Sequence, residues 1–125
     1  MLTKKRRLKK EEIQSVKDKG SFLGTPFFSL LYMKAKKGRS VPSKFAFVLS
    51  KKVSKKATER NRTKRILAGS VRSLIKEIQE EGYLVLFLVK KRAIGADRQV
   101  ILDTISNAFL KIGLLKNEEY STDLN

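Results

Sequence analysis

The stretch that decides the fold is residues 83–89, which read YLVLFLV and carry no charged side chain. A continuous apolar run of this length is typical of a strand that is buried on both faces of a sheet. The segment before it, about residues 55–79, has the pattern of a helix that ends before Gly82. We therefore predict a long amphipathic helix that leads into a central strand. The apolar residues that recur at the spacing of a buried helical stripe are Leu67, Val71, Leu74, Ile75 and Ile78.

Further toward the N-terminus, residues 44–50 (KFAFVLS) predict a second strand. Large and small side chains alternate along it, so they face opposite sides of the sheet. We expect the large residues to face the core and the small ones to form an open floor. The large residues are Phe45, Phe47 and Leu49, and the small residues are Ala46, Val48 and Ser50.

Three more elements complete the predicted fold. A short amphipathic helix ends at Gly20, residues 27–33 (FFSLLYM) form a strand, and residues 97–112 form the last helix. The resulting order predicts an α+β fold, an α-β-β-α-β-α sandwich around a small central sheet. Residues 1–115 would form a single domain, and residues 116–125 a frayed tail.

The charge of the chain is concentrated in its first half. The 125 residues include 29 Lys+Arg and 12 Asp+Glu, a formal net charge of +17. Residues 1–65 hold 21 basic and 4 acidic side chains, whereas residues 66–125 hold 8 of each. Such a one-sided field favours a polyanion, because nucleic acids release counterions when Lys and Arg neutralise their phosphates. We therefore expect a nucleic-acid partner.

The composition also excludes several classes of chemistry. The chain has no His and no Cys, which removes zinc sites built on those ligands, Cys nucleophiles, disulfides and imidazole proton transfer. No apolar run reaches the roughly 18 residues of a membrane span, and the basic N-terminus lacks the apolar core of a signal peptide. These features predict a cytoplasmic protein with neither a membrane partner nor a small-molecule substrate.

The densest cluster of charge lies on the predicted helix and the loop before it. Glu59 is the only acid between Lys51 and Lys76, so nine basic side chains have almost no local neutralisation. Like charges held together destabilise a fold unless an anion is present, and Arg suits bidentate phosphate contacts. At helical spacing, four residues would share a face opposite the apolar stripe: Asn61, Arg65, Ala68 and Arg72.

This region resembles the signature of the bacterial ribonuclease P protein subunit, in which an Arg-Asn-Arg motif is followed by Lys-Arg. The resemblance extends over most of residues 4–112 through the element order, chain length and lysine-rich loop. It implies the fold described as ribosomal protein S5 domain 2-like, with a left-handed βαβ crossover. The residues that carry the resemblance are Ser50, Lys51, Lys52, Ala57, Glu59, Arg60, Asn61, Arg62, Lys64, Arg65 and Arg72.

The resemblance implies a protein cofactor of a catalytic RNA. In this family the RNA acts as an endoribonuclease that removes the 5′ leader of precursor tRNA with bound Mg²⁺, and the protein helps bind the leader. We therefore assign no catalytic and no metal-binding protein residue, with ribonuclease P RNA and precursor tRNA as partners. Residues implied to bind the catalytic RNA are Lys51, Lys52, Lys56, Arg60, Asn61, Arg62, Lys64, Arg65 and Arg72. Those implied to line a leader cleft between the first helix and the sheet are Ile13, Val16, Lys17, Phe27, Ser29, Leu31, Ala46, Val48 and Ser50.

Three positions depart from the family pattern. The family often has a basic residue where Ala68 stands, and the neighbouring Gly69 costs about 1 kcal/mol of helix propensity relative to Ala. The first helix commonly carries aromatic residues in this family, whereas this chain has Ile13 and Lys17 there. Phe27 or Tyr32 could supply the missing ring, although a place in the core is the more common one for either residue, and the strand register decides which faces the cleft.

Two other classes of function remain open from the sequence. A ribosomal or other structural RNA-binding protein would share the charge and the lack of catalytic groups. A nuclease with a carboxylate metal site would need clustered acids, but the acids of the first half are scattered at Glu11, Glu12, Asp18 and Glu59. Stimulation of leader cleavage by the cognate RNA would separate these classes from a ribonuclease P subunit.

Overall fold

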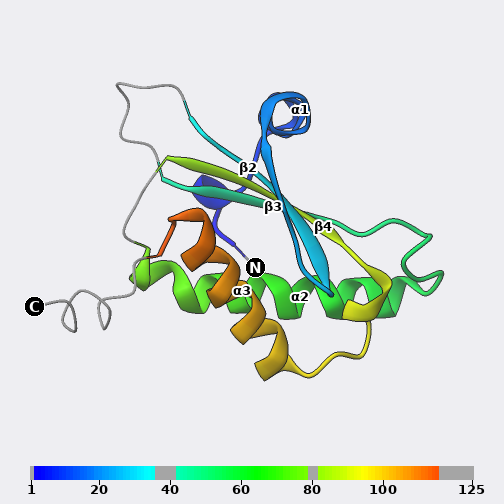
Figure 1. The fold of residues 1–125 in the computed structure, drawn as a ribbon. Helices are drawn as coiled ribbons and strands as arrows, with labels where there is room; N and C mark the ends of the chain where they lie inside the picture. The colour runs from blue at the N-terminus through cyan, green and yellow to red at the C-terminus, as the bar shows by residue number, and fades with distance from the viewer. Residues whose placement is uncertain (1, 36–41, 79–81, 116–125) are drawn as a thin grey trace, which may run out of the picture.

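The computed structural model describes residues 2–35, 42–78 and 82–115, and Figure 1 shows how its elements are arranged. The predicted tail, residues 116–125, lies outside these ranges. Short 3₁₀ turns η1 (Lys4–Arg6), η2 (Ile75–Glu77) and η3 (Lys91–Ala93) accompany the longer elements. The longer elements are α1 (Lys10–Lys19), β1 (Ser21–Gly24), β2 (Phe28–Lys34), β3 (Lys44–Val48), α2 (Ala57–Leu74), β4 (Tyr83–Val89) and α3 (Arg98–Ile112).

All six predicted elements are present, within a few residues of their expected ends. The α+β prediction is confirmed, but the four-stranded sheet contains one strand that the sequence did not reveal. This strand, β1, pairs antiparallel with β2, so the strand order is β1-β2-β4-β3. The apolar run of β4 lies between β2 and β3, where the predicted central strand should lie.

The helices cover both faces of the sheet. Figure 1 shows α1 on one face and α2 and α3 on the other. The main core lies between the sheet and the α2 and α3 helices, where four phenylalanine rings are almost fully buried. The ring of Phe87 lies 5.0 Å from that of Phe28, and Phe45 stacks on Phe109 at 5.7 Å. A smaller cluster beneath α1 joins Val16 to Leu84 and Leu86.

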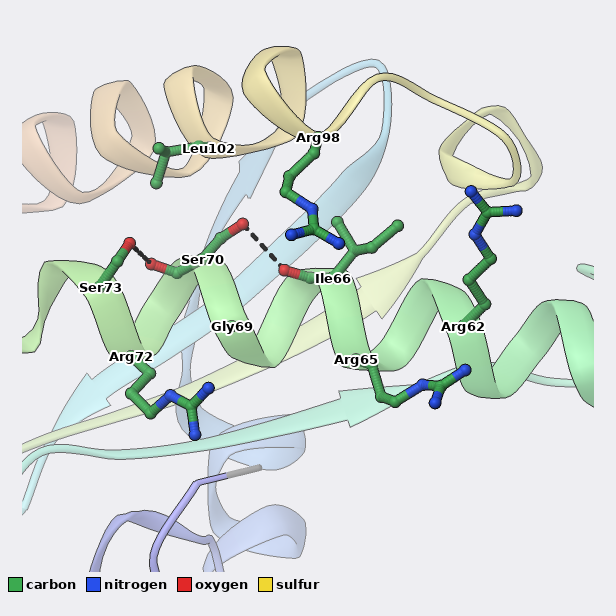
Figure 2. A pocket seen from close by; sticks show the side chains of 9 residues that line it. All are labelled: Arg62, Arg65, Ile66, Gly69, Ser70, Arg72, Ser73, Arg98 and Leu102. Carbon is green, nitrogen blue, oxygen red and sulfur yellow. Dashed lines mark hydrogen bonds between the residues drawn. The ribbon is translucent and has the colours of Figure 1, made fainter.

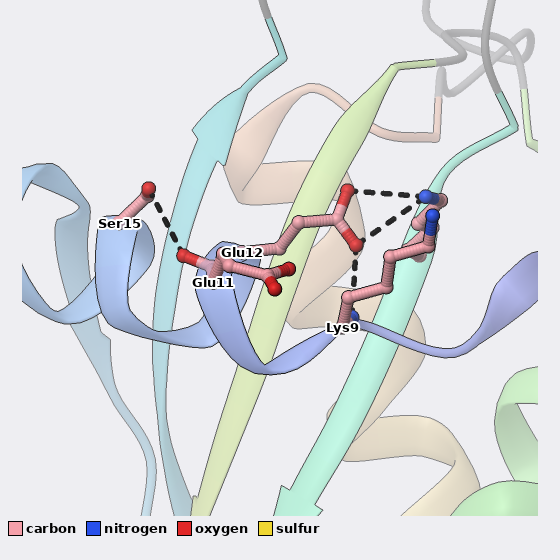
Figure 3. Close-up of polar contacts among 5 residues, drawn as sticks. Lys9, Glu11, Glu12 and Ser15 are labelled. Carbon is pink, nitrogen blue, oxygen red and sulfur yellow. Dashed lines mark hydrogen bonds and ion pairs between the residues drawn. The ribbon is translucent and has the colours of Figure 1, made fainter.

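The connection from β3 through α2 to β4 is left-handed. The two strands are parallel neighbours, and α2 packs on the face opposite α1. Figure 3 views the sheet from the α1 side, with β3 to the right of β4 and both strands running downward. Seen from the α2 side with the strands pointing up, the chain therefore moves to the left from β3 to β4. Parallel units are right-handed in about 98% of cases, so this rare hand confirms the topology that the resemblance implies.

Glu12 fixes the position of α1 on the sheet. Its Oε1 accepts a hydrogen bond of 2.8 Å from the backbone N–H of Lys9, just before the helix (Figure 3). Its Oε2 lies 3.0 Å from Nζ of Lys44, at the start of β3. One carboxylate thus satisfies a free amide at the N-terminus of α1 and ties that end to the sheet edge.

Candidate RNA interface

The α2 helix presents the densest row of cations in the described part of the chain. Its buried side includes Leu67, Val71 and Leu74, which anchor the helix to the sheet. The rest of the helix surface therefore faces solvent. Figure 2 shows the side chains of Arg62, Arg65 and Arg72 extending from it. The exposed residues of the predicted set on α2 are Asn61, Arg62, Lys64, Arg65 and Arg72.

The turn that precedes α2 is organised around Ser54. Its Oγ donates a hydrogen bond of 2.6 Å to Oε1 of Glu59 and accepts one of 3.2 Å from the backbone N–H of Lys56. The half-buried Arg60 donates from Nη1 to the carbonyl oxygen of Ser54 at 2.7 Å. Arg60 and Glu59 thus help to form the turn, and the exposed lysines that the motif predicts, Lys51, Lys52 and Lys56, lie on it.

Ala68 does not belong to the exposed face, so that prediction is wrong. Its side chain is 2% exposed and joins the main core. The reason lies in the N-terminal segment, because Leu2 is also buried and lines one cavity together with Ala68 and Phe45. A residue that the helical pattern places beside the arginines is therefore covered by a segment distant in sequence. A basic side chain at position 68 would lose its hydration there.

A hollow of about 640 Å³ lies between α2 and α3, and we call it the α2–α3 hollow. Arg98, which sequence reasoning missed, reaches into it from the first residue of α3 (Figure 2). No local motif marks this arginine, because it lies in the half of the chain with no net charge. The hollow is lined by Arg62, Arg65, Ile66, Gly69, Ser70, Arg72, Ser73, Arg98 and Leu102.

The other predicted surface is the face of the sheet on which α1 lies. Strand register places Leu31, Leu86 and Ala46 in one row across this face, and Ser29, Leu88 and Val48 in the next. The side chain of Val48 is 37% exposed, as an open floor requires. Ser50 lies beyond the end of β3 and is exposed, and Lys17 is exposed on α1. Two of the three predicted floor residues, Ala46 and Val48, are therefore on this face, and the half-buried Ile13 packs in the same cluster as Ala46.

Three residues of the predicted leader set do not line an open cleft. Val16 is fully buried beneath α1, because it fills the space above Leu84 and Leu86. Phe27 packs against the main core on the other side of the sheet, as Tyr32 does, so neither ring reaches the α1 face. Ser29 lies in the correct row but is only 7% exposed. Val16 and Phe27 therefore do not belong to the candidate leader-binding surface.

Phe22 is an exposed aromatic ring on the α1 face that the sequence analysis did not single out. It lies on the unpredicted strand β1 directly opposite Leu31, so it shares the α1 face with the floor residues. Its side chain is 65% exposed, which is unusual for a phenylalanine. The signal in the sequence was an aromatic residue between Gly20 and Gly24, but no pattern indicated its strand.

The described residues do not form a resident magnesium site. Within residues 2–35, 42–78 and 82–115, no three carboxylates gather closely enough to hold a metal ion. Mg²⁺ prefers oxygen ligands, and the surfaces described above offer mainly cations and apolar groups. The residues present therefore do not fit the ion. Over the same ranges, no helix is long and apolar enough to cross a bilayer.

Comparison with solved structures identifies the fold. The ribonuclease P protein of Staphylococcus aureus superposes with a TM-score of 0.75 at 16% identity, over 91% of this chain and 100% of that chain. The protein from Thermotoga maritima gives a TM-score of 0.70 at 22% identity, over 82% and 93% of the two chains. At these identities the likeness establishes the shared fold.

Comparison of sequences identifies the family. A ribonuclease P protein component of Microcystis aeruginosa is 34% identical over 74 residues, covering 59% of this chain and 61% of the relative. One from Synechocystis sp. is 34% identical over 76 residues, covering 58% of each protein. The alignments thus span about three fifths of these curated relatives. The family model for ribonuclease P matches residues 2–113, nearly the whole described chain. The chain belongs to the ribonuclease P protein family.

Proposed function

We propose that this protein is the protein cofactor of ribonuclease P and that it acts by binding two RNAs. The observation that carries the proposal is the exposed cationic row on α2, in a chain that belongs to this family. Arginine and lysine side chains on one helix face can contact successive phosphates of a folded RNA. The α2 face would bind the catalytic RNA, assisted by the turn that carries Lys51, Lys52 and Lys56.

The α1 face of the sheet is the proposed site for the 5′ leader of precursor tRNA. Its floor includes Ala46 and the exposed Val48 on the edge strand β3, and Phe22 is exposed on β1, the opposite edge strand of the same sheet. Single-stranded RNA binds well to such surfaces, because bases stack on aromatic rings while cations such as Lys17 attract the backbone. The two RNA surfaces therefore lie on opposite sides of the sheet, so one protein molecule can bind both partners.

The protein is proposed to contribute binding and position, and the RNA to hold the metal. Divalent ions can activate water and stabilise the leaving oxygen during hydrolysis of a phosphodiester bond. The described residues offer no carboxylate cluster for such an ion. Cations on α2 would instead reduce phosphate repulsion where the catalytic RNA packs closely, which lowers the concentration of Mg²⁺ that its active form requires.

A cleavage assay tests this function. Precursor tRNA and the cognate ribonuclease P RNA are incubated at low Mg²⁺ with and without the protein, and the mature 5′ end is quantified. We expect cleavage to be restored by the protein and to be absent with RNA-free protein. An RNA-binding protein of the ribosome would bind RNA without this stimulation, and site-specific cleavage by RNA-free protein would indicate a nuclease. Either result would refute the proposal.

The Val48→Trp variant tests the leader site separately. An indole at this exposed position would occupy the floor, so precursor tRNA with a leader should bind more weakly while mature tRNA binds as before. Assembly with the catalytic RNA should not change, because α2 lies on the other face. If Val48 were ordinary core, overpacking would instead destabilise the fold by about 1–3 kcal/mol, which a thermal melt would detect.

A further inference from the structure

The α2–α3 hollow is lined by Gly69, a glycine that the fold of the protein does not require. Gly69 lies inside α2, where glycine is among the least favourable residues. Glycine is required where φ is positive or where another atom approaches closely, and neither condition holds at this position. A Cβ built on Gly69 would meet no atom within 4 Å, and the positive-φ glycines of the described chain are Gly82, Gly95 and Gly113.

Arg98 is a second locally unfavourable residue at the same hollow. It is the first residue of α3, where the helix dipole disfavours a positive charge. Although Arg98 is exposed, its side chain extends from α3 toward α2 (Figure 2). Residues that disagree with their local structure tend to lie at functional sites, and here two of them border one hollow.

The charges around the hollow lack partners in the described chain. Arg62, Arg65 and Arg72 come from α2, and Arg98 comes from α3. In Figure 2, Arg62 and Arg98 lie on the α3 side of α2, whereas Arg65 and Arg72 extend from its other side. Among the residues that the structure describes, none of these four guanidinium groups forms an ion pair with a carboxylate. Four unpaired arginines around a concave surface produce a positive potential that an extended anion would relieve.

The serine hydroxyl groups at the hollow can accept hydrogen bonds but have no hydrogen left to donate, which suits a sugar hydroxyl. Ser70 Oγ donates its hydrogen to the carbonyl oxygen of Ile66 at 2.8 Å, and Ser73 Oγ donates to that of Ser70 at 2.7 Å. Ser70 is only 6% exposed, but Ser73 is exposed, so the Ser73 oxygen keeps lone pairs available for a donor from outside the protein. A 2′-hydroxyl is such a donor, and RNA carries one on every nucleotide.

We propose that the α2–α3 hollow holds a sugar–phosphate strand of RNA, which crosses α2 at Gly69 and is held by Arg98 on one side and by Arg65 and Arg72 on the other. The missing Cβ lets the strand approach the helix backbone. This inference rests on the proposed function for the identity of the RNA, which is a strand of the catalytic RNA. It adds α3 to a binding surface that the motif confines to α2 and the loop before it.

The Gly69→Ala variant gives opposite effects on stability and on binding. Alanine improves helix propensity and meets no neighbour, so the Tm of the free protein should rise. The added methyl group holds the strand away from α2, so affinity for the catalytic RNA should fall by about tenfold, the equivalent of one charge-assisted hydrogen bond. Asn107→Ala is the matched control, because it improves propensity at an exposed position of α3 outside the hollow. It should raise Tm and leave affinity unchanged.

The Arg98→Ala variant tests the contribution of α3. Its matched control is Lys111→Ala, which removes the same charge from the same helix outside the hollow. Arg98→Ala should reduce the slope of log affinity against log salt by about 0.9, as expected for one lost phosphate contact. Lys111→Ala should leave the slope near that of the original protein. The Tm of Arg98→Ala should not fall, because the helix dipole disfavours this arginine.

The outcomes separate this inference from the proposed function. If the original protein does not bind the catalytic RNA, the proposed function itself fails. If it binds and Gly69→Ala binds equally well, the hollow holds no RNA and the inference is overturned. A fall in Tm for Gly69→Ala would also overturn it, because the glycine would then serve the fold. Equal effects of Arg98→Ala and Lys111→Ala on the salt slope would show that only total charge matters. That result would contradict a specific RNA contact at Arg98 on α3.

Discussion

Gly20 shows at the level of one residue how α1 is held on the sheet. It ends α1, and its N–H donates a hydrogen bond of 2.8 Å to the carbonyl oxygen of Val16. A Cβ at this position would clash with that same oxygen and would lie 3.2 Å from the carbonyl oxygen of Tyr32 on β2. The backbone of the turn after α1 thus lies directly against β2.

The Gly20→Ala variant should therefore be less stable. We expect the free energy of unfolding to fall by about 1–3 kcal/mol, because rigid backbone atoms must move to admit the methyl group. Denaturant unfolding followed by circular dichroism measures this change. The same substitution at Gly69 should raise stability, so the pair forms an internal comparison. Equal stability of the two variants would show that the turn relaxes freely and does not fix α1.

Phe22 offers a second prediction at this scale. If its exposed ring stacks on a leader base, Phe22→Ala should weaken binding of precursor tRNA by about 1–3 kcal/mol, the usual contribution of one base–aromatic contact. The ring is 65% exposed, so the free energy of unfolding should change by no more than about 0.5 kcal/mol. Fluorescence titration of leader-bearing and mature tRNA measures the difference.

The matched variants for this prediction keep either the ring or the bulk. Phe22→Tyr preserves a stacking surface and should bind the leader like the original protein, whereas Phe22→Leu keeps apolar bulk without a ring and should behave like Phe22→Ala. Equal loss of affinity for mature tRNA would contradict a leader contact. It would place Phe22 against the body of the tRNA instead.

At the scale of elements, α2 is predicted to bind RNA through phosphates. Replacing both Arg62 and Arg65 by alanine should weaken assembly with the catalytic RNA and reduce the salt slope by about 0.9 for each lost contact. Filter binding over a range of salt concentrations measures the slope. The double variant Lys91→Ala with Lys111→Ala removes the same charge elsewhere and should change the slope less. Equal slopes for the two double variants would argue for a diffuse field in place of a binding helix.

The elements themselves could largely be predicted from periodicity, because α2, α3 and β4 carry strong local patterns. The strand β1 could not, since the three residues between Gly20 and Gly24 have no pattern of their own and become a strand only because β2 offers a free edge. The predicted exposure of single residues was wrong in two cases because exposure, like the pairing of β1, depends on neighbours distant in sequence. Val16 and Ala68 are each buried by a segment distant in sequence, which a helical pattern does not describe. The motif located the cations of α2, but only the packing of α3 against α2 brings Arg98 to them.

At the scale of the whole molecule, charge and fold oppose each other. The formal net charge of +17 is concentrated in the first half of the sequence, which includes α1, β3 and the start of α2. Mutual repulsion destabilises the compact state, and surface pairs such as Glu12 with Lys44 offset little of it. The connection from β3 through α2 to β4 is also left-handed, a hand that few proteins adopt. The folded state should therefore depend on the anions that its surfaces are built to bind.

Millimolar pyrophosphate should raise the Tm of this protein more than sodium chloride does at the same ionic strength. Chloride only screens repulsion, whereas an anion that binds the folded state stabilises it by mass action, by about 2.7 kcal/mol at one hundred times its Kd. The low concentration keeps the general salting effect of phosphates small. The variant with Arg62 and Arg65 replaced by alanine should lose most of the difference between the two salts, because α2 then lacks adjacent guanidinium groups. Identical melting curves in both salts would mean that screening alone supports the fold, and that the cationic row on α2 does not form a binding site before RNA is present.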